Sequence, residues 1–256
     1  MRAIIVGYGT VGHNLAEELA GIDHGTYDRC LGVYDKYKGI RDYGGRYDVA
    51  FVCVDTPLVD GRLDITEVEA AVLENDADVF VVKSTVPVGT TRRLAEETGR
   101  RVVFSPEYYG STQHANDFDF DFTILGGPRE DCVPVIQLLQ EAYDGRHRFR
   151  MTDYETAELT KLMENAWLAT KVSFCCQMAD IAEREGVCYE ELRELFLLDE
   201  RVSPAHTFFY RDRPYWQSHC LDKDVPELAN AYDAPLIRAV IDFNESLKHP
   251  NTCANI

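Results

Sequence analysis

A glycine-rich loop close to the start of the chain restricts the possible folds more than any other feature. The loop, Gly7–Gly12 (GYGTVG), joins an apolar run, Ala3–Val6, to a stretch with helical periodicity, Val11–Ala20. A strand, a tight glycine turn and a helix in this order are typical of the first βαβ unit of an open α/β sheet. We therefore expect the chain to start with a buried strand and not with a signal peptide.

Apolar runs and helical stretches alternate over about the first 150 residues. The runs are rich in Val, Ile and Phe, which is typical of parallel strands buried on both faces. Strands alternating with helices form βαβ units, so we predict an α/β fold with a Rossmann-like, doubly wound parallel sheet. The expected strands are Ala3–Val6, Leu31–Tyr34, Val49–Val54, Val79–Val82, Val102–Phe104 and Phe122–Leu125, and the expected helices are Val11–Ala20, Ile65–Glu74, Thr90–Glu97 and Pro128–Tyr143.

The rest of the chain is predicted to be all-helical. One long helix is expected to start at Tyr154, with Asp153 as its N-cap, and to stop at Gly186. We therefore divide the chain into a domain at 1–150 and a helical domain at 151–256. Further helices are expected at Tyr189–Leu198 and Ala234–Lys248, with an irregular segment at Ser203–Asp224.

Net charge and cysteine content limit the classes of binding partner and the cellular compartment that we expect. The formal net charge of −18 weighs against a nucleic-acid partner, because phosphate contacts require clustered Lys and Arg. No apolar run approaches the roughly 20 residues of a membrane-spanning helix, so no membrane partner is expected. The eight cysteines form no CxxC pair and have no zinc-ligand spacing. We predict no metal site, reduced thiols and a cytoplasmic protein.

The glycine loop has the spacing of a dinucleotide-binding turn. Its glycines would permit the turn, the approach of a pyrophosphate and close packing of the helix, whose N-terminus would bind the phosphates. Asp35 follows Gly12 by 23 residues, where it can accept hydrogen bonds from a ribose diol. This acid favours NAD over NADP, although Lys36 and Lys38 leave NADP open. A structural glycine turn with a surface Asp35 is the alternative.

Polar residues follow the ends of the next expected strands, where ligands bind in open α/β sheets. They are candidates for the cofactor crevice, and helix capping or turn formation is the alternative for the hydroxyl residues. The candidates are Asp55 and Thr56 after the third strand together with Val54 at its end, Ser84 and Thr85 after the fourth, and Glu107 after the fifth.

Two polar groups in the helical half could carry chemistry. Glu158, Lys161 and Asn165 share one face of the long helix, for which a solvated stripe is the alternative. Cys220 stands beside a histidine and near Lys223, an environment that can activate a thiol as a nucleophile. A structural cysteine is the alternative.

Together, these segments resemble the UDP-glucose/GDP-mannose dehydrogenase family, and within it the UDP-glucose 6-dehydrogenases. The resemblance implies NAD as the cofactor and oxidation of the C6 alcohol of a nucleotide sugar to the acid with two NAD. It also implies a homodimer joined through the long helix. It covers nearly the whole chain and rests on GYGTVG, Asp35, CVDTP, KSTVPVGTT, SPEYYG, AELTKLMENAWLATKVSF and HCLDKD, in the family's order.

The resemblance also implies a covalent mechanism. Cys220 would capture the aldehyde as a thiohemiacetal and later carry the acyl group as a thioester. Lys161 and Asn165 would stabilise the oxyanion that develops.

The remaining roles concern protons and the cofactor. Asp224 with a water would handle protons, Glu107 would act in thioester hydrolysis, and Thr85 would help to hold that water. The cofactor-binding set expected from the motifs is Gly7, Tyr8, Gly9, Thr10, Val11, Gly12, Asp35, Lys36, Val54, Asp55, Thr56, Ser84, Thr85, Glu107 and Lys223.

The chain departs from the family in two places. Family members usually carry a third, Rossmann-like domain that helps to bind the nucleotide, and this sequence stops before one. Their glycine-rich approach to the nucleophile, GFGGxC, is replaced by Arg213–His219.

From the resemblance as a whole we expect an NAD-dependent nucleotide-sugar 6-dehydrogenase. The alternatives are a site completed by a partner chain, a non-catalytic relative that binds NAD or a sugar nucleotide, and a two-electron dehydrogenase of the β-hydroxyacid type.

Overall fold

The computed structural model describes residues 1–20, 31–42, 45–108, 120–143 and 145–249 of the chain. The chain divides into two compact units. The first unit consists of Met1–Val59 and Leu63–Lys161, and the second of Asp60–Arg62 and Leu162–Ile256. The long helix α5, Tyr154–Arg184, starts in the first unit and continues in the second.

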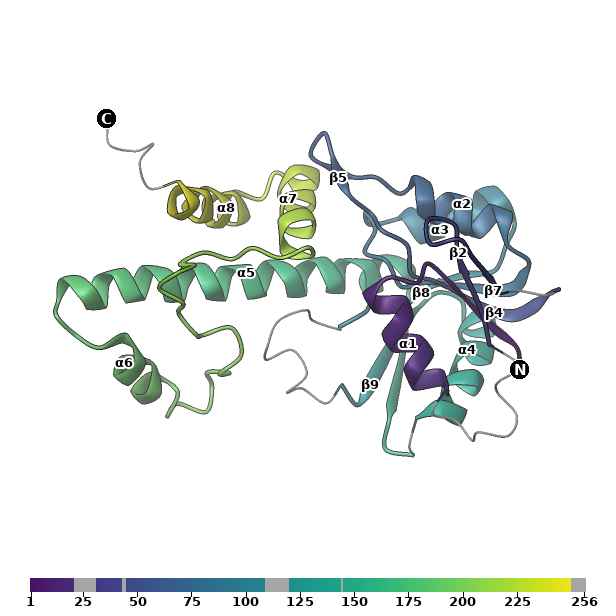
Figure 1. The fold of residues 1–256 in the computed structure, drawn as a ribbon, viewed down its shortest axis with the longest axis horizontal. Helices are drawn as coiled ribbons and strands as arrows, with labels where there is room; N and C mark the ends of the chain where they lie inside the picture. Colours follow the sequence, from purple (N-terminus) through teal and green to yellow (C-terminus); the bar gives the residue numbers. More distant parts are fainter. Residues whose placement is uncertain (21–30, 43–44, 109–119, 144, 250–256) are drawn as a thin grey trace. The chain divides into compact units, whose positions relative to one another are not determined.

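An eight-stranded sheet forms the centre of the first unit (Figure 1), as expected for the predicted α/β fold. The sheet is mostly parallel, and the two antiparallel pairings are those of β3 with β2 and of β9 with β8. The turn between β2 and β3 is too short for the crossover that parallel strands need. In order across the sheet, the strands are β10 (Arg148–Thr152), β9 (Phe122–Gly126), β8 (Val102–Phe104), β7 (Ala77–Val82), β4 (Tyr47–Val52), β1 (Ala3–Val6), β2 (Leu31–Asp35) and β3 (Ile40–Asp42).

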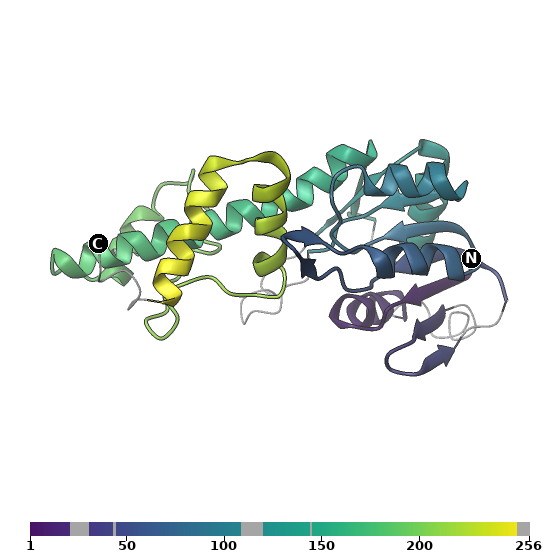
Figure 2. The same ribbon diagram turned by 90° about the horizontal axis from the view of Figure 1, so that it is seen from above.

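Helices cover both faces of this sheet (Figure 2). Alternate strand residues point to opposite faces, so Ile5 and Phe51 lie in one apolar core and Ile4 and Phe80 in the other. The first core is closed by α1 (Thr10–Ala20) and α4 (Arg129–Ala142), and the second by α2 (Thr66–Glu74) and α3 (Thr90–Thr98).

The strand order reverses between β1 and β4. The chain passes from β1 to β2 on one side and then crosses to β4 on the other side of β1. The N–H of Gly7 donates to the carbonyl of Tyr34 at 2.8 Å, and the N–H of Cys53 to that of Val6 at 2.7 Å. Three strand ends therefore converge on the glycine loop, at the kind of switch point where open α/β sheets bind ligands.

The second unit is built from the remainder of α5 and from α6 (Tyr189–Phe196), α7 (Leu221–Tyr232) and α8 (Pro235–Lys248). The C-terminus of α5 is closed as expected around Gly186, which has φ of +67°. The N–H of Gly186 donates to the carbonyl of Glu183, and that of Val187 to the carbonyl of Ala182. This pair of bonds is a Schellman motif.

Helix α7 is the main element that the sequence did not reveal. The segment predicted to be irregular, Ser203–Asp224, is helical from Leu221 onward. The buried residues of α7 include Lys223, Asp224 and Glu227, so charged residues interrupt its apolar periodicity. The short strands β3, β5 (Leu58–Val59), β6 (Arg62–Leu63) and β10 were also not predicted.

The turn between β5 and β6 belongs to the second unit. Arg62 donates to the carboxylate of Glu227 on α7 at 3.0–3.1 Å, and Asn230 of α7 donates to the carbonyl of Gly61 at 2.9 Å. Glu227 is only 1% exposed. This contact ties α7 to the turn between β5 and β6 through a buried carboxylate.

Candidate functional site

The glycine loop has the backbone shape that its sequence predicts. Gly7 has φ of +93°, and a Cβ there would lie 2.6 Å from the carbonyl oxygen of Cys53. A Cβ at Gly12 would collide with the carbonyl oxygen of Gly7 and lie 3.0 Å from the Ile5 side chain. Gly9 differs, because no atom lies within 4 Å of a Cβ built there. The fold therefore requires Gly7 and Gly12, whereas the space beside Gly9 is open to a ligand.

Helix α1 continues directly from this loop. It begins at Thr10, so Thr10 and Val11 lie in its first turn, where main-chain N–H groups lack partners within the helix. The ring of Tyr8 packs edge-on against His13, with centroids 5.4 Å apart. An open glycine beside a helix N-terminus fits the pyrophosphate of a dinucleotide.

Asp35, at the end of β2, forms a hydrogen bond with the glycine loop. Its Oδ2 accepts the N–H of Tyr8 at 2.9 Å, and its Oδ1 accepts those of Tyr37 and Lys38 at 3.0 and 2.9 Å. Burial raises the pKa of Asp35, but the three backbone hydrogen bonds outweigh it and leave the pKa below its ordinary value. An ionised carboxylate has about four acceptor positions, so room remains on Oδ2 for one ribose hydroxyl.

The two lysines after Asp35 have separate contacts. Lys36 forms an ion pair with Glu67 of α2 at 2.6 Å, which raises the pKa of Lys36. Lys38 reaches the glycine loop, where its Nζ donates to the carbonyl of Tyr8 at 2.5 Å. The structure therefore places Lys38, not Lys36, against the predicted phosphate turn.

Hydroxyl groups link the ends of β4 and β7. Ser84 donates to the carbonyl of Val54 at 2.6 Å, and Thr56 donates to that of Thr85 at 2.8 Å. The carboxylate of Asp55 accepts the N–H of Thr56 at 2.9 Å. Turn formation thus accounts for Ser84 and Thr56. No hydrogen bond involves the hydroxyl of Thr85 within the described residues, which leaves it available to a ligand or a water.

Glu107 is held by a residue that the sequence did not single out. Its Oε2 lies 2.9 Å from Nζ of Lys83 at the end of β7, and both side chains are largely buried. Its Oε1 accepts the N–H of Tyr108 at 2.7 Å. Burial raises the pKa of the nearby Cys53 thiol to about 12, so this thiol stays protonated at neutral pH. The position of Lys83, one residue before the Ser84–Thr85 pair, was the available signal.

Lys161 lies near Tyr108, the residue that follows Glu107. It is only 8% exposed, and its ammonium lies 4.9 Å from the ring centroid of Tyr108, within the range of a cation–π interaction. The Tyr108 ring also packs edge-on against Phe122 at 5.1 Å. Tyr108, which the sequence did not indicate, therefore connects Lys161 with the neighbouring Glu107 in the first unit.

Glu158 caps a helix. It is fully buried, and its carboxylate accepts the N–H groups of Gly89 and Thr91 at 2.6 and 2.8 Å, at the N-terminus of α3. Burial raises its pKa, and the bonds from Thr91 and Gly89 oppose that shift. The alternative of a solvated stripe is wrong, since Glu158, Lys161 and Asn165 are all buried.

In the second unit, Asn165 of α5 and Asp224 of α7 come together. The amide of Asn165 donates to Oδ2 of Asp224 at 2.6 Å, and Nζ of Lys223 lies 2.7 Å from Oδ1. Asp224 is fully buried, and Asn165 and Lys223 are 3% and 9% exposed. Both oxygens of the carboxylate are therefore engaged, and Lys223 pairs with the predicted proton-handling acid.

Cys220 stands at the head of α7. It is the N-cap residue of the helix, it is exposed, and its carbonyl accepts the N–H of Asp224 at 2.9 Å. Cys220 therefore stands at the end of α7 where the helix dipole is positive. Lys161 belongs to the first unit and Cys220 to the second.

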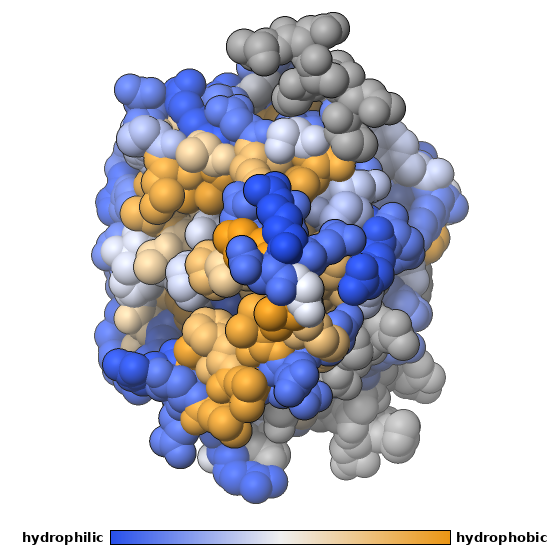
Figure 3. All heavy atoms as spheres, turned by 90° about the vertical axis from the view of Figure 1, so that its left-hand side faces the viewer, coloured by the Kyte–Doolittle hydropathy of each residue, from blue (hydrophilic) through white to orange (hydrophobic). Residues whose placement is uncertain are grey.

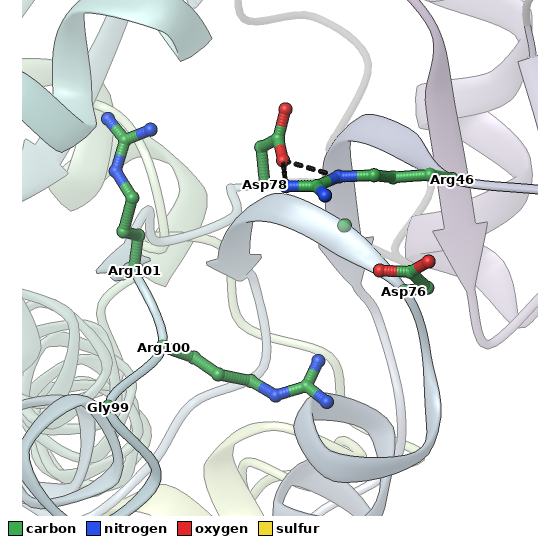
Figure 4. A pocket seen from close by; sticks show the side chains of 7 residues that line it. Arg46, Asp76, Asp78, Gly99, Arg100 and Arg101 are labelled. Atoms are coloured by element: carbon green, nitrogen blue, oxygen red, sulfur yellow. Dashed lines mark hydrogen bonds and ion pairs between the residues drawn. The ribbon is translucent and has the colours of Figure 1, made fainter.

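A cavity of about 370 Å³ lies away from all these residues (Figure 4). It is lined at the amino ends of β4, β7 and β8, including Arg46, Arg100 and Arg101. Arg46 pairs with Asp78, Arg101 pairs with Asp131, and Arg100 donates to main-chain carbonyls. None of the predicted site residues lines it.

Two general features concern metals and membranes. Among the residues that the structure describes, no group of three or more His, Cys, Asp or Glu is placed to hold a metal ion. Within the same ranges, each helix is too short or too polar to span a bilayer.

Comparison with known families decides the identity of both halves. The NAD-binding domain of the UDP-glucose/GDP-mannose dehydrogenase family matches residues 36–145, and the central domain of that family matches residues 155–246. The chain belongs to the UDP-glucose/GDP-mannose dehydrogenase family. The matched domain confirms NAD as the cofactor. Its match begins directly after Asp35, so the assignment of the glycine loop rests on the loop's own geometry.

Individual relatives agree with this assignment. The chain is 31% identical to UDP-glucose 6-dehydrogenase TuaD of Bacillus subtilis over 219 residues, which are 77% of this chain and 46% of that protein. It is 32% identical to UDP-glucose 6-dehydrogenase of Pseudomonas aeruginosa over 217 residues, 75% of this chain and 47% of that protein. The structure of UDP-D-ManNAc dehydrogenase from Pyrococcus horikoshii is similar, with a TM-score of 0.75, 25% identity and coverage of 96% and 69% of the two chains. The chain thus spans about half the length of these curated relatives.

Proposed function

We propose that this chain is an NAD-dependent nucleotide-sugar dehydrogenase that oxidises the C6 alcohol of a UDP-glucose-like substrate to the carboxylate. The observation that carries the proposal is the exposed Cys220 at the head of α7, in the turn that leads to Lys223 and Asp224 of the buried Asn165–Asp224–Lys223 group. The curated relatives named above are UDP-glucose 6-dehydrogenases, which supports this substrate class.

The proposed chemistry proceeds through the thiol of Cys220. The alcohol loses a hydride and a proton to give an aldehyde, whose carbon the thiolate attacks to form a C–S bond. Loss of a second hydride and proton gives a thioester, and attack by water breaks the C–S bond and releases the acid. Overall, R–CH₂OH, water and two NAD⁺ give R–COO⁻, two NADH and three protons.

Other residues would support these steps. The ammonium of Lys161 and the amide of Asn165 would stabilise the oxyanion, and both side chains are buried in their units. Asp224 would handle protons through a water. Glu107 would act in thioester hydrolysis, with the unpaired hydroxyl of Thr85 holding the water.

The first unit would hold NAD along the carboxyl edge of its sheet. Gly9 and the first turn of α1 would contact the pyrophosphate, and Asp35 would accept a hydrogen bond from the adenosine ribose. Bound NAD would accept the hydride in each oxidation. Asp55 and Ser84 would line the crevice beside it, since they lie at the ends of β4 and β7.

The test is NADH formation, measured by absorbance, with NAD and a panel of UDP-, GDP- and ADP-sugars. We expect two NADH for each sugar oxidised, loss of this activity in Cys220→Ala, and its retention in Cys188→Ala, which removes the thiol of another exposed cysteine. Full activity of Cys220→Ala would exclude the covalent mechanism. One NADH for each substrate would support a two-electron dehydrogenase. NAD binding without turnover on any sugar would support a non-catalytic or partner-dependent relative.

We also propose that two copies of the chain associate through α5. Met163, Trp167, Phe174 and Ile181 of this helix are 41–69% exposed, and their spacings of four and seven residues place them along one stripe. Figure 3 views the end at which α5 leads to α6 and shows further orange patches between polar groups. Light scattering should find a dimer that Trp167→Glu dissociates and Leu236→Glu, on exposed α8 surface, does not. A monomeric wild-type chain would refute this.

A further inference from the structure

Trp216 is buried in a segment that has no helix or strand. It lies between α6 and α7, four residues before Cys220, where the neighbouring residues Gln217 and His219 are exposed. Trp216 itself is only 4% exposed. A large aromatic residue fixed at this point must determine how the chain approaches α7.

Three hydrogen bonds hold Trp216 to two helices. Its indole N–H donates to Oγ of Ser173 on α5 at 3.0 Å. Its main-chain N–H donates to Oδ1 of Asn244 on α8 at 2.9 Å, and its carbonyl accepts from Nδ2 of the same Asn244 at 3.1 Å. Ser173 and Asn244 are 6% and 1% exposed. We name these three residues the Trp216 anchor.

The anchor shares its apolar core with the helix that follows Cys220. Trp216 packs in one cluster with Leu221 and Val225 of α7, Ala169 of α5 and Val240 of α8. Leu221 is the residue directly after Cys220. The chain is therefore buried on both sides of the exposed thiol, at Trp216 before it and at Leu221 after it.

The residues between these two points start the helix. Oγ of Ser218 accepts the N–H of Leu221 at 3.1 Å, and the carbonyl of Ser218 accepts that of Asp222 at 3.1 Å. The path from Trp216 to α7 is thus defined by hydrogen bonds at Trp216, Ser218 and Cys220, whose carbonyl accepts the N–H of Asp224.

We propose that the Trp216 anchor is the positioning device for Cys220, because it fixes the main chain that carries the thiol at the head of α7. Both main-chain polar groups of Trp216 are occupied by Asn244. The main-chain N–H of Trp216 is therefore not available as a donor to a ligand that approaches Cys220. This inference builds on the proposed role of Cys220, but its test does not require turnover.

The experiment removes the hydrogen bond between the indole N–H of Trp216 and the hydroxyl of Ser173. Each partner is replaced in turn, with Trp216→Phe and Ser173→Ala, in the full chain. The rate of alkylation by iodoacetamide is measured at Cys220 and at the exposed Cys188 of the same molecule, by mass spectrometry of peptides. A helix N-terminus activates a thiol only while the sulfur stays beside it. We expect the rate ratio of Cys220 to Cys188 to fall about fivefold, corresponding to the loss of about 1 kcal/mol, a typical hydrogen-bond contribution.

Two controls separate positioning from general loosening. Ser246→Ala removes another hydroxyl, one on α8 that donates to the carbonyl of Phe243, and should leave the ratio unchanged. The double variant Trp216→Phe, Ser173→Ala should match the single variants, because both remove the same bond. The indole N–H signals of Trp167, which is 60% exposed, and Trp216 in nuclear magnetic resonance report whether Ser173→Ala breaks the bond.

An unchanged ratio in folded Ser173→Ala, with the Trp216 indole signal shifted, would overturn the proposal. An equal fall in Ser246→Ala would also overturn it, because the effect would not be specific to the anchor. A fall of the rate ratio in Trp216→Phe and in Ser173→Ala, with no fall in Ser246→Ala, would support the proposal. If the wild-type chain then failed to form NADH with any sugar, the proposed function would fail while the positioning role of Trp216 would stand.

Discussion

Two polar clusters, one in each unit, are held in different ways. In the first unit, Asp35, Thr56 and Ser84 at the strand ends bond mainly to main-chain N–H and carbonyl groups. In the second unit, Asn165 and Lys223 bond to the buried side chain of Asp224. The first arrangement depends on where the backbone runs, and the second depends on which charges are present.

This difference has an energetic consequence. A group that bonds to the backbone can often be replaced at the cost of one or two hydrogen bonds, about 1 kcal/mol each. Removing one member of a buried, charged group leaves its partner without compensation, which costs more. We therefore expect the cluster around Asp224 to be more sensitive to a change of charge, and the cluster around the glycine loop to a change of backbone shape.

The largest effect is expected for Asp224→Ala. The substitution leaves the ammonium of Lys223 buried without its counter-charge and the amide of Asn165 without its acceptor. We expect the free energy of unfolding to fall by about 3–5 kcal/mol, as when one partner of a buried ion pair is removed. Urea unfolding measures the change. Asp242→Ala, an exposed acid on α8, is the control and should change stability by less than about 0.5 kcal/mol.

A second substitution tests whether the lost stability comes from the buried, unpaired charge of Lys223. In Asp224→Ala, Lys223→Met, neither charge remains, so much of the lost stability should return. If the double variant is as unstable as Asp224→Ala, or if Asp224→Ala costs no more than Asp242→Ala, the buried charge pair does not govern this unit.

The next effect concerns the glycine loop. In Gly12→Ala the new Cβ collides with the carbonyl of Gly7, so we expect a loss of about 2–3 kcal/mol from overpacking. Gly9→Ala should leave stability within about 0.5 kcal/mol, because nothing lies near its Cβ. That methyl group would instead occupy the space proposed for the pyrophosphate. Calorimetric titration with NAD should show weaker binding to folded Gly9→Ala.

This pair of variants distinguishes fold from binding within one loop. If Gly9→Ala binds NAD as tightly as the wild-type chain, the dinucleotide does not pass over Gly9. If Gly12→Ala is as stable as Gly9→Ala, the close packing of α1 on the sheet is not required.

The same comparison explains what could be predicted from the sequence. The strands of the first unit are continuous apolar runs, so β1 and β8 were predicted with their correct ends, and the glycine turn located the switch point. Topology then places Asp35, Thr85 and Glu107 at one edge without knowledge of any contact. The sequence also predicted Asp153 as the N-cap of α5. In the structure, the carboxylate of Asp153 accepts the N–H of Thr156 at 2.8 Å.

What could not be predicted depends on contacts between distant residues. The capping of α3 by Glu158 joins positions 67 and 69 residues apart, and the Trp216–Asn244 bonds join positions 28 residues apart. Helix α7 was missed because Lys223 and Asp224 neutralise each other in its buried face, which no apolar pattern records. Lys83 and Tyr108 were passed over because their partners, Glu107 and Lys161, lie in other segments.

The smallest effect, Asp35→Asn, tests whether a backbone-bonded acid also depends on charge. Its pKa is lowered in the folded state, so its ionised form contributes stability that is complete above the unfolded value, about 3.9. That contribution is lost as the pH falls through the folded value. We expect Asp35→Asn to cost about 1–2 kcal/mol at pH 7, measured by urea unfolding, and the difference from wild type to shrink as the pH approaches about 3. Asp212→Asn, at an exposed site, should show little difference at any pH. A cost for Asp35→Asn that stays constant with pH would mean that the loop needs the shape of Asp35 and not its charge, which would separate the two units more sharply still.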